Sequence, residues 1–351
     1  MSLRIGMLAP ITHSYPPEGY GPWERVTYDL TESLVAAGHS VTLFAAEGSQ
    51  TAARLHATAP APLSERPGAD HRLAEDAHIT MALHACDDLG IDILHSHLHV
   101  HVLDREDLWD GPIVSTLHGV AWDPEVRKRL DHHSGRPFVS LSDRERAFHP
   151  GLNYVATIPN GIATEEFPRG PGDGGYVVFV GRLSPEKAPH LAVAAAQLAG
   201  IPILLAGIIE DQHREYARAV LANVNGPGVD YLGPLNRPDL VEVIHGAAAT
   251  LMPLEWDEPF GLVVVESLAC GTPVVAWRRG AMPEIVEDGK TGFLVDDVQS
   301  AAAALGRIDE ISRDHCAREA RRRFDRSVMA SAYAEVYRRI SSSRPARRRA
   351  V

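Results

Sequence analysis

Short apolar runs alternate with amphipathic stretches along most of the chain, and this alternation is typical of parallel α/β proteins. In the first half, the apolar runs predict strands at Leu3–Ala9, Ser40–Ala46, Ile91–His95, Ile113–Leu117, Phe138–Leu141 and Tyr154–Ile158. The amphipathic stretches between them predict helices at Trp23–Ala37, His71–Leu89 and Ser142–Phe148. The first half therefore predicts one parallel sheet covered by helices.

A break follows at Pro168–Gly175, where the sequence PRGPGDGG has linker composition. The alternation then restarts with strands at Tyr176–Val180, Pro202–Ala206, Asp230–Leu232, Thr250–Pro253 and Pro273–Ala276. Helices are predicted at Pro189–Leu198, Asp211–Asn223, Arg237–Ala247, Phe260–Ala269 and Ser327–Ile340.

These elements predict an α/β protein of two doubly wound, Rossmann-like domains that face a central cleft, with ligands at the carboxyl ends of the strands. We place the first domain at 1–168 and the second at 169–326. A helix at 327–343 is expected to pack back on the first domain, and the basic tail 344–351 is expected to be disordered. Hinge closure across 165–175 would exclude water from the cleft.

Composition fits a globular protein, because 45% of the 351 residues are apolar and 23% are charged. A formal charge of −12 argues against a nucleic-acid partner, which requires a basic face. The three cysteines (Cys86, Cys270 and Cys316) are too scattered for a disulfide framework or a thiolate metal site. Since the chain shows neither a signal peptide nor a membrane-spanning run, we expect a cytoplasmic protein with at most peripheral membrane contact.

Three glycines, Gly170, Gly172 and Gly175, spell the G-x-G-x-x-G of a dinucleotide turn. That turn follows a strand and opens a helix, whereas these glycines precede the predicted strand Tyr176–Val180. We therefore interpret them as linker.

The segment VFVGRLSPEKAPH carries more chemistry, because Arg182 and Lys187 follow the end of a predicted strand. Such a loop can present a guanidinium, an ammonium and backbone N–H groups to a diphosphate. The alternative is a solvated loop with two surface cations. Lys187 is one of only three lysines, with Lys128 and Lys290, which favours the phosphate role.

In EPFGLVVVESLACGTPVV, Glu258 precedes a predicted helix and Glu266 lies inside it. The N–H groups of Gly261, Leu262 and Val263 at the helix start form a natural phosphate seat. A glycoside-hydrolysing acid/base pair is the rival, but it needs carboxyls about 5–9 Å apart, and eight residues along one helix separate them further.

Taken together, these motifs resemble the retaining glycosyltransferases of family 4, which have the two-domain GT-B fold. The match includes E-x7-E (Glu258 to Glu266), G-R-L-x-x-E-K (Gly181 to Lys187) and P-N-G-I (Pro159 to Ile162). It also includes T-L-H-G at Thr116–Gly119, D-I-L-H-S-H at Asp92–His97 and P-E-I-V-E-D-G-K-T-G-F-L-V at Pro283–Val295. These elements span nearly the whole chain in the family's order.

The resemblance implies roles for individual residues. Arg182 and Lys187 would hold the diphosphate of a nucleotide-sugar donor, Glu266 would bind its ribose, and Glu258 would grip the sugar hydroxyls. The amides around Phe260 and Gly261 would assist Glu258, His118 would sit beside the donor sugar, and Asn160 would lie in a loop near the cleft. Members of the family retain anomeric configuration and generally need no metal or other cofactor.

Three departures from the family pattern concern the donor site. Pro22 stands where a second glycine is usual, so one phosphate-binding N–H is missing while Gly21 remains. Ala163 replaces a frequent aspartate. Before Pro283, the sequence Arg278-Arg279-Gly280-Ala281 replaces the usual glycine pair.

Two further clusters have alternative interpretations. His95, His97, His99 and His101 alternate and would share one face of an extended segment as metal ligands do, but no carboxylate or cysteine completes a set, so we predict no metal. Arg127-Lys128-Arg129 with Arg136 could bind anionic lipid. Nearby Asp123, Glu125 and Asp131 favour a solvated face instead.

The sequence thus predicts a retaining hexosyltransferase that uses a nucleotide diphosphate sugar, with a UDP-sugar favoured over GDP-mannose. The acceptor would be a hydroxyl of a saccharide, glycolipid or natural product. Four aromatic residues are candidates either for stacking surfaces or for the core: Tyr15, Tyr20, Trp23 and Trp122. The alternatives are a nucleotide-sugar epimerase and a non-catalytic nucleotide-sugar-binding protein, and homodimerisation is left open.

Overall fold

The computed structural model describes residues 2–19, 21–119, 123–222 and 228–342. It divides into two compact units: a first unit, Met1–Gly161 with Arg326–Val351, and a second unit, Ile162–Asp325. The boundary therefore falls at Gly161 rather than at residue 168, and the predicted tail 344–351 lies outside the described residues.

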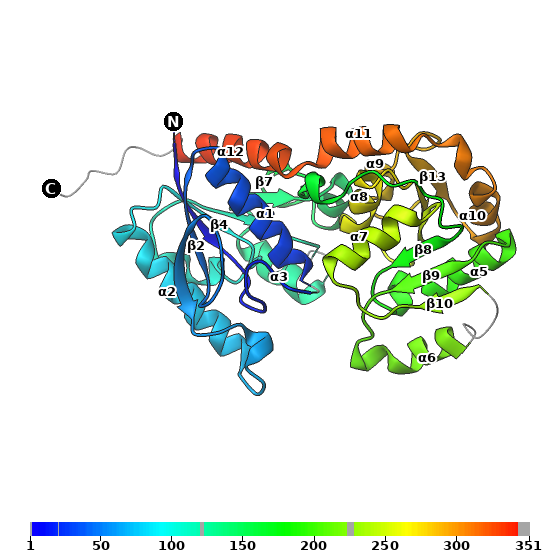
Figure 1. The fold of residues 1–351 in the computed structure, drawn as a ribbon. Coiled ribbons are helices and arrows are strands. Elements are labelled where there is room, and N and C mark those ends of the chain that lie inside the picture. The colour runs from blue at the N-terminus through cyan, green and yellow to red at the C-terminus, as the bar shows by residue number, and fades with distance from the viewer. Residues whose placement is uncertain (1, 20, 120–122, 223–227, 343–351) are drawn as a thin grey trace. The chain divides into compact units, whose positions relative to one another are not determined.

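The first unit is built on a seven-stranded sheet in the order β3-β2-β1-β4-β5-β6-β7, and the paired strands are parallel (Figure 1). Its strands are β1 Arg4–Leu8, β2 Ser40–Ala46, β3 Arg54–Ala59, β4 Ile93–Ser96, β5 Ile113–Thr116, β6 Phe138–Ser140 and β7 Tyr154–Thr157. Its α-helices are α1 Pro22–Ala36, α2 His71–Asp88, α3 Pro124–His132, α4 Asp143–Phe148 and α12 Arg326–Ser342. Strand β3 and helix α3 are not among the predicted elements.

The last helix, α12, belongs to the first unit although it follows the second in the chain. It packs against α1 and buries two aromatic side chains, Tyr333 and Tyr337. The hydroxyl of Tyr337 lies 2.7 Å from His95 Nδ1, and that of Tyr333 lies 2.8 Å from Thr116 Oγ1. The helix thereby fixes the ends of β4 and β5, from which the candidate site of this unit begins.

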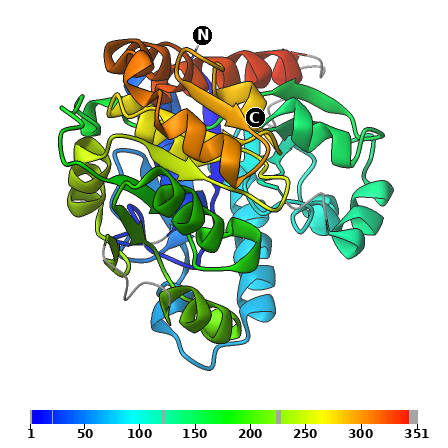
Figure 2. The same cartoon turned by 90° about the vertical axis from the view of Figure 1, so that its right-hand side faces the viewer.

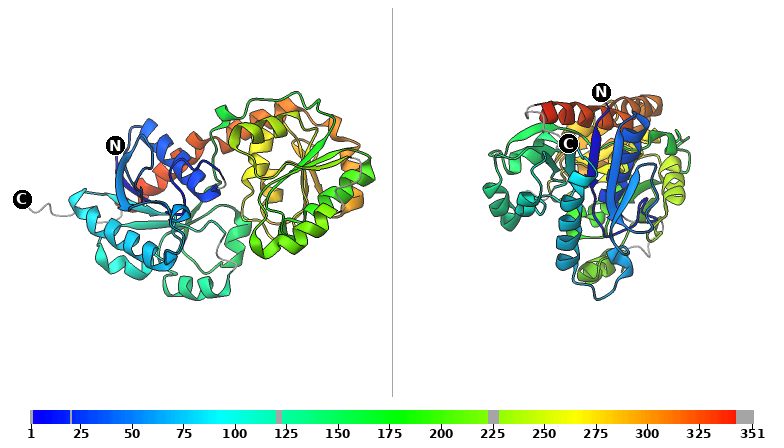
Figure 3. Two further views of the ribbon diagram at one scale, coloured as in Figure 1. Left: turned by 60° about the horizontal axis from the view of Figure 1, so that its bottom comes forward. Right: turned by 90° about the vertical axis from the view of Figure 1, so that its left-hand side faces the viewer.

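The second unit has a parallel six-stranded sheet in the order β10-β9-β8-β11-β12-β13. Its strands are β8 Val177–Val180, β9 Ile203–Ala206, β10 Val229–Tyr231, β11 Thr250–Met252, β12 Val274–Trp277 and β13 Gly292–Val295. Its α-helices are α5 Pro189–Ala199, α6 Arg214–Ala222, α7 Arg237–Gly246, α8 Leu262–Ala269, α9 Met282–Ile285, α10 Val298–Leu305 and α11 Arg313–Phe324. Helices cover both faces of each sheet, as Figures 2 and 3 show from further directions.

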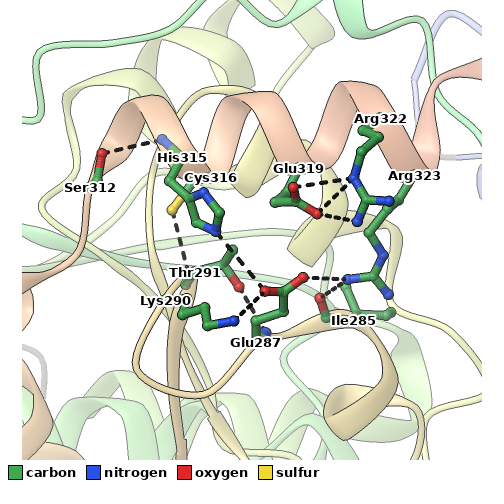
Figure 4. A network of polar contacts seen from close by, with 10 residues as sticks. All are labelled: Ile285, Glu287, Lys290, Thr291, Ser312, His315, Cys316, Glu319, Arg322 and Arg323. Carbon is green, nitrogen blue, oxygen red and sulfur yellow. Dashed lines mark hydrogen bonds and ion pairs between the residues drawn. The ribbon is translucent and has the colours of Figure 1, made fainter.

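Polar contacts tie α11 to the loop before β13 (Figure 4). Arg323 donates from Nη1 to the carbonyl of Ile285 at 3.1 Å, and its Nη1 lies 3.8 Å from a carboxylate oxygen of Glu287. Lys290 approaches the other oxygen of Glu287 at 3.6 Å, and the backbone N–H of Glu287 donates to Thr291 Oγ1 at 2.9 Å. These contacts fix the conformation of the P-E-I-V-E-D-G-K-T-G segment. Among the elements around this segment, β13, α10 and α11 were not predicted from the sequence.

The glycine-rich stretch at 168–175 is held inside the second unit. Gly170 N–H donates to the carbonyl of Cys270, and Gly172 N–H donates to the carbonyl of His245. Arg313 donates from Nε to the carbonyl of Gly170 at 3.0 Å. The stretch is therefore not the boundary between the units, although its composition is that of a linker.

Among the described helices, none has the length and apolar character needed to span a membrane.

Candidate functional site

In the second unit, the loop after β8 carries the first predicted cation, Arg182. Its Nη2 lies 3.1 Å from Glu186 Oε1, and its Nη1 lies 3.2 Å from Glu210 Oε1. Burial raises the pKa of Glu186, but hydrogen bonds from Ser184 and from its own N–H, with the charge of Arg182, bring the pKa below its ordinary value. Two carboxylates thus orient the guanidinium, whose side chain keeps 26% of its surface exposed.

The second predicted cation, Lys187, contacts the predicted sugar-binding carboxylate of Glu258 directly through Nζ and Oε2. The indole of Trp256 donates to the same Oε2 at 2.9 Å, and Lys187 Nζ lies 5.0 Å from the indole ring centroid. The side chains of Lys187 and Glu258 are only 15% and 12% exposed. The fold thus joins two residues, far apart in sequence, into one buried ion pair with Trp256 as a shared partner.

The backbone of the unusual Arg278–Ala281 segment supports this pair. Gly280 N–H donates to Asp257 Oδ1 at 3.0 Å, and Ala281 N–H donates to the carbonyl of Glu258 at 2.8 Å. Gly280 has φ +60°, and a Cβ there would lie 2.4 Å from the Glu258 nitrogen. Arg279 itself is exposed. Although the segment departs from the family pattern, it contains Gly280, the glycine on which the position of Glu258 depends.

Helix α8 begins at Leu262, four residues after Glu258. Its N-cap is Gly261, with φ 106° and no side-chain cap, so the first N–H groups of Leu262 and Val263 have no partner within the helix. Phe260 is buried, with its ring 5.9 Å from that of Phe324. The predicted amides therefore lie at the start of a buried helix, where a positive dipole end favours an anion.

Glu266 lies on α8, and its side chain is 11% exposed. Arg237, at the start of α7, approaches Glu266 Oε1 at 3.5 Å and stacks on Phe167 with its guanidinium carbon 4.4 Å from the ring centroid. Arg237 was missed by the sequence analysis, because the arginine before Pro238 belongs to no motif and its partners lie far away in sequence.

Asn160 and Ala163 follow β7 on either side of the boundary between the units. Asn160 is 5% exposed, and Ala163 is fully buried. The neighbouring Thr164 hydroxyl donates to Asp325 Oδ2 at 2.5 Å within the second unit. Ala163 thus leaves no carboxylate at the position where similar sequences often carry aspartate.

In the first unit, His118 follows β5 in the left-handed conformation, with φ 48°. Its Nε2 lies 2.8 Å from His97 Nδ1, and the two rings stack with centroids 5.0 Å apart. Both side chains are buried, and burial, together with the neighbouring imidazoles, holds the pKa of each well below the usual histidine range. The pair is therefore neutral at physiological pH.

The four alternating histidines do not share one face, because β4 ends at Ser96. His95 contacts Thr116 Oγ1 at 2.8 Å, whereas His97 contacts His118 and His101 approaches Glu75 Oε1 at 3.2 Å. Burial lowers the pKa of His95 to about 3 and that of His99 to about 4. Within the described residues, no group of three or more His, Cys, Asp or Glu side chains is arranged to hold a metal ion.

Glu145 secures the loop that carries His118. Its carboxylate accepts from the N–H of Gly119 and from the N–H of Leu141, the latter at 2.6 Å. Burial raises the pKa of Glu145 to about 7, against the effect of these two N–H donors. The sequence S-x-x-E at Ser142–Glu145 is a capping-box signal for α4, but it does not indicate that the glutamate reaches Gly119 instead.

The start of α1 holds the remaining predicted donor residue. Gly21 is the N-cap, Pro22 occupies the first helical position, and Gly21 offers no side-chain cap. Glu24, missed by the sequence analysis, is only 4% exposed there. Burial raises the pKa of Glu24, partly offset by its own N–H and by the charge of His13.

The candidate stacking residues separate by exposure. Tyr15 is buried at 1% exposure, whereas Trp23 is 41% exposed. The Trp23 ring centroid lies 5.0 Å from that of His99 and 6.1 Å from that of His118. Tyr20 and Trp122 lie outside the described residues. Trp23 is therefore the described candidate that offers an accessible aromatic surface.

Three cations of the basic cluster, Lys128 and Arg129 on α3 and Arg136 after it, are paired with carboxylates. Arg129 contacts Asp104, Arg136 Nη2 lies 2.5 Å from Glu106 Oε1, and Lys128 Nζ lies 2.6 Å from Glu125 Oε1. These contacts fit the solvated-face interpretation. A cavity of about 640 Å³ nearby is lined by residues that include Glu106, Trp109, Arg136, Asn153 and Arg339, and none of the predicted site residues lines it.

Two family models match the chain in succession. The model described as Glycosyltransferase Family 4 matches residues 23–166, and the model described as Glycosyl transferases group 1 matches residues 164–328. The glycogen synthase of Mycobacterium tuberculosis is 29% identical over 93% of each chain. A D-inositol 3-phosphate glycosyltransferase of Acidothermus cellulolyticus is 36% identical, over 52% of this chain and 43% of that protein.

Solved structures give the same architecture. A glycosyltransferase involved in avilamycin A biosynthesis is 24% identical, with a TM-score of 0.76 over 97% of this chain and 99% of its own. HepE from Anabaena, in complex with UDP-glucose, is 20% identical, with a TM-score of 0.73 over 96% of this chain and 100% of its own. At these identities the likeness shows the fold, which is the GT-B architecture of two parallel-sheet α/β domains.

Proposed function

The chain belongs to the glycosyltransferases of family 4, and from that premise we propose that it transfers a hexosyl group from a nucleotide diphosphate sugar to a hydroxyl acceptor, with retention of anomeric configuration. One observation supports this proposal most strongly. In the second unit Lys187 contacts Glu258, Arg182 lies on the loop after β8, and α8 starts at Leu262; the family resemblance assigns these residues to donor binding.

In this proposal, Arg182 and Lys187 bind the diphosphate and neutralise the charge that develops on the nucleotide as it leaves. The N–H groups at the start of α8 add to that stabilisation. Because Lys187 is paired with Glu258 in this structure, donor binding draws its ammonium towards phosphate and releases the carboxylate for a sugar hydroxyl. Glu266, held by Arg237, accepts from the ribose hydroxyls.

The two cations supply the charge stabilisation that a divalent metal gives in other transferases, so we propose that turnover needs no metal. Activity that survives exhaustive chelation supports this part of the proposal, and activity that only Mg²⁺ or Mn²⁺ restores contradicts it.

In the first unit, His118 is proposed to donate a hydrogen bond to the donor sugar. Trp23 is proposed to give the acceptor an accessible aromatic surface.

A nucleotide-sugar epimerase on the same fold and a non-catalytic binding protein are the rivals. An epimerase would convert UDP-N-acetylhexosamine without an acceptor, and its product would carry the same nucleotide. A binding protein would hold the donor without turnover. Glu258→Ala separates the last case from ours, because the substitution abolishes transfer only where Glu258 takes part in catalysis.

The first experiment is thermal unfolding of the full chain with millimolar UDP, GDP, ADP or TDP, without added metal. A nucleotide at about 100 times its Kd adds about 2.7 kcal/mol to the free energy of unfolding. We propose UDP as the nucleotide that raises the midpoint most, and Arg182→Ala should lose that rise while Lys290→Ala keeps it, since Lys290 is 67% exposed and paired with Glu287. If no nucleotide shifts the midpoint, with or without Mg²⁺, the proposal fails.

A further inference from the structure

The contact between His97 and His118 determines which ring nitrogen His118 offers to a ligand. Both imidazoles are neutral, so the 2.8 Å contact between His97 Nδ1 and His118 Nε2 holds a single proton. One of the two nitrogens is therefore the donor and the other the acceptor. The tautomer of each ring follows from that choice.

The surroundings of His97 decide between the two arrangements. In the described part of the chain, His97 Nε2 is buried and has no hydrogen-bond partner. If His97 Nδ1 accepted, its only proton would sit on this buried Nε2 as an orphaned donor. A buried N–H without a partner is the rarer and costlier state in folded proteins. His97 therefore carries its proton on Nδ1 and donates to His118 Nε2, which leaves the proton of His118 on Nδ1.

The His97 ring is itself fixed. Its centroid lies 4.2 Å from that of His95, whose two nitrogens contact Thr116 Oγ1 at 2.8 Å and the Tyr337 hydroxyl at 2.7 Å. The orientation of His97 is thus set by packing from the strand ends and from α12, rather than by solvent.

We propose that His97 is a positioning residue for sugar transfer: it engages His118 Nε2, so that His118 presents Nδ1–H as a hydrogen-bond donor towards a hydroxyl of the sugar substrate. The inference rests on the proposed function for the identity of the ligand. The His118 backbone is held in the left-handed conformation, and Glu145 binds the next N–H, so the ring has a defined direction in which to donate. His118 then acts as a neutral donor and not as a base.

The tautomer can be measured without any substrate. In protein labelled with ¹⁵N-histidine, two-bond ¹H–¹⁵N correlation spectra distinguish protonated from bare ring nitrogens, and loss of one signal set in His118→Gln and in His97→Gln assigns the two rings. We expect His118 with the proton on Nδ1 and His97 also with the proton on Nδ1. A proton on His118 Nε2 overturns the inference, whatever the enzyme transfers.

Kinetics test the consequence for transfer. His97→Phe keeps a stacked ring and removes the donor, whereas His97→Asn places an amide N–H near the position of Nδ1. For metal-bound histidines, loss of the hydrogen bond that orients the ring typically costs about 10–100-fold in affinity or activity, and we take that range as the guide for His118. We expect His97→Phe to lower kcat by that factor with little change in donor KM, and His97→Asn to recover most of it.

Failure of this inference and failure of the proposed function give different results. If His97→Phe folds, binds nucleotide with unchanged midpoint shift and keeps full kcat, the positioning role is wrong while the donor site stands. If His97→Phe does not fold, His97→Asn and the spectra of the unmodified chain decide. If no nucleotide binds at all, the proposed function fails, and the spectra still test the tautomer.

Discussion

The candidate sites of the two units differ in charge: the first is built from neutral side chains and the second from ion pairs. The site of the first unit consists of buried neutral imidazoles: His95, His97, His99 and His118 all have a pKa below the usual histidine range because burial disfavours their charged form. The site of the second unit consists of ion pairs, in which Lys187 contacts Glu258, Arg182 lies between two carboxylates and Arg237 approaches Glu266.

The two candidate sites should therefore respond differently to salt, pH and substitution. A neutral hydrogen bond depends on the direction of its donor, so the first unit should tolerate salt but fail when its histidines become protonated. A buried ion pair depends on both charges being present, and removing one leaves the other uncompensated in a poorly solvated place. We therefore expect the second unit to be sensitive to single substitutions and the first to be sensitive to pH.

The largest expected effect is that of Lys187→Ala on sugar transfer. The substitution removes one of the two cations proposed to stabilise the leaving diphosphate and leaves Glu258 buried without its ammonium partner. Removing one such stabilising group typically costs about 10²–10³-fold in kcat. The loss is measured as kcat in steady-state transfer assays, with the sugar of the nucleotide that stabilises the protein most as the donor.

Lys290→Ala is the matched control, because it removes a lysine of the same unit that is 67% exposed. It should transfer at the unmodified rate. If both lysine variants lost activity equally, the comparison between a buried pair and an exposed one would be wrong.

The second effect is acid destabilisation confined to the first unit. Burial lowers the pKa of His78 to about 4, from an unfolded value near 6.5. The unfolded chain therefore binds more protons in this window, and stability falls as the pH drops from about 6.5 towards 4. One such histidine lowers the free energy of unfolding at pH 5 by about 2 kcal/mol relative to its value at pH 8. Glu145, with a pKa raised to about 7, opposes this below pH 7, but the lowered histidines outnumber it.

Hydrogen exchange at pH 7.5 and pH 5, corrected for the intrinsic rate, measures the two units separately. Peptides from β1, β4 and β5 should lose protection in acid before those from β8, β11 and β12. His78 lies outside the candidate site, between Thr58 Oγ1 and the carbonyl of Ala9, so His78→Gln should reduce the pH dependence without touching His118. Earlier loss of protection in the second unit would contradict the comparison.

A third effect tests whether the backbone, and not charge alone, places Glu258. Gly280→Ala puts a methyl group 2.4 Å from the Glu258 nitrogen and adds strain at φ +60°. Displacement of the carboxylate should reduce kcat/KM about tenfold, which corresponds to about 1.4 kcal/mol. Gly289→Ala is the control for strain alone, since Gly289 has φ +74° with no atom within 4 Å of the added Cβ. Equal losses in both variants would assign the effect to backbone strain.

The sequence predicted the sheets well where apolar runs were long and isolated. Strand β2 has the same bounds as its prediction, Ser40–Ala46, and the other predicted strands differ from the observed ones by no more than two residues at either end. Strand β3 was missed because Arg54–Ala59 lies at the sheet edge, is part-exposed and has no continuous apolar run, since its polar and apolar residues alternate. Helix α11 was missed because Arg313–Phe324 is rich in arginine, and the buried residues before Phe324 are small ones, Cys316, Ala317 and Ala320.

Motifs single out candidate site residues, but they could not identify the residues that hold these candidates in position. Arg182, Lys187 and Glu258 stood out by type and spacing, whereas Glu145, Arg237 and the pairing of His97 with His118 depend on contacts between distant strands and helices. The boundary was placed wrongly for a related reason. Composition at 168–175 indicates a linker, but only the fold shows hydrogen bonds from Gly170 and Gly172 to the second unit.

The smallest expected effect concerns Trp23, the exposed aromatic ring beside His99 and His118 in the first unit. An aromatic surface can stack on the apolar face of an acceptor, and a partly exposed stacking contact contributes about 1 kcal/mol or less. Trp23→Ala should raise the acceptor KM about three- to fivefold, leave the donor KM unchanged, and be largely rescued by Trp23→Phe. Leu73→Ala, at another exposed apolar position of the same unit, is the control. If Trp23→Ala raised the donor KM instead, the aromatic ring would serve the donor together with His118, and the proposed role of Trp23 in acceptor binding would be wrong.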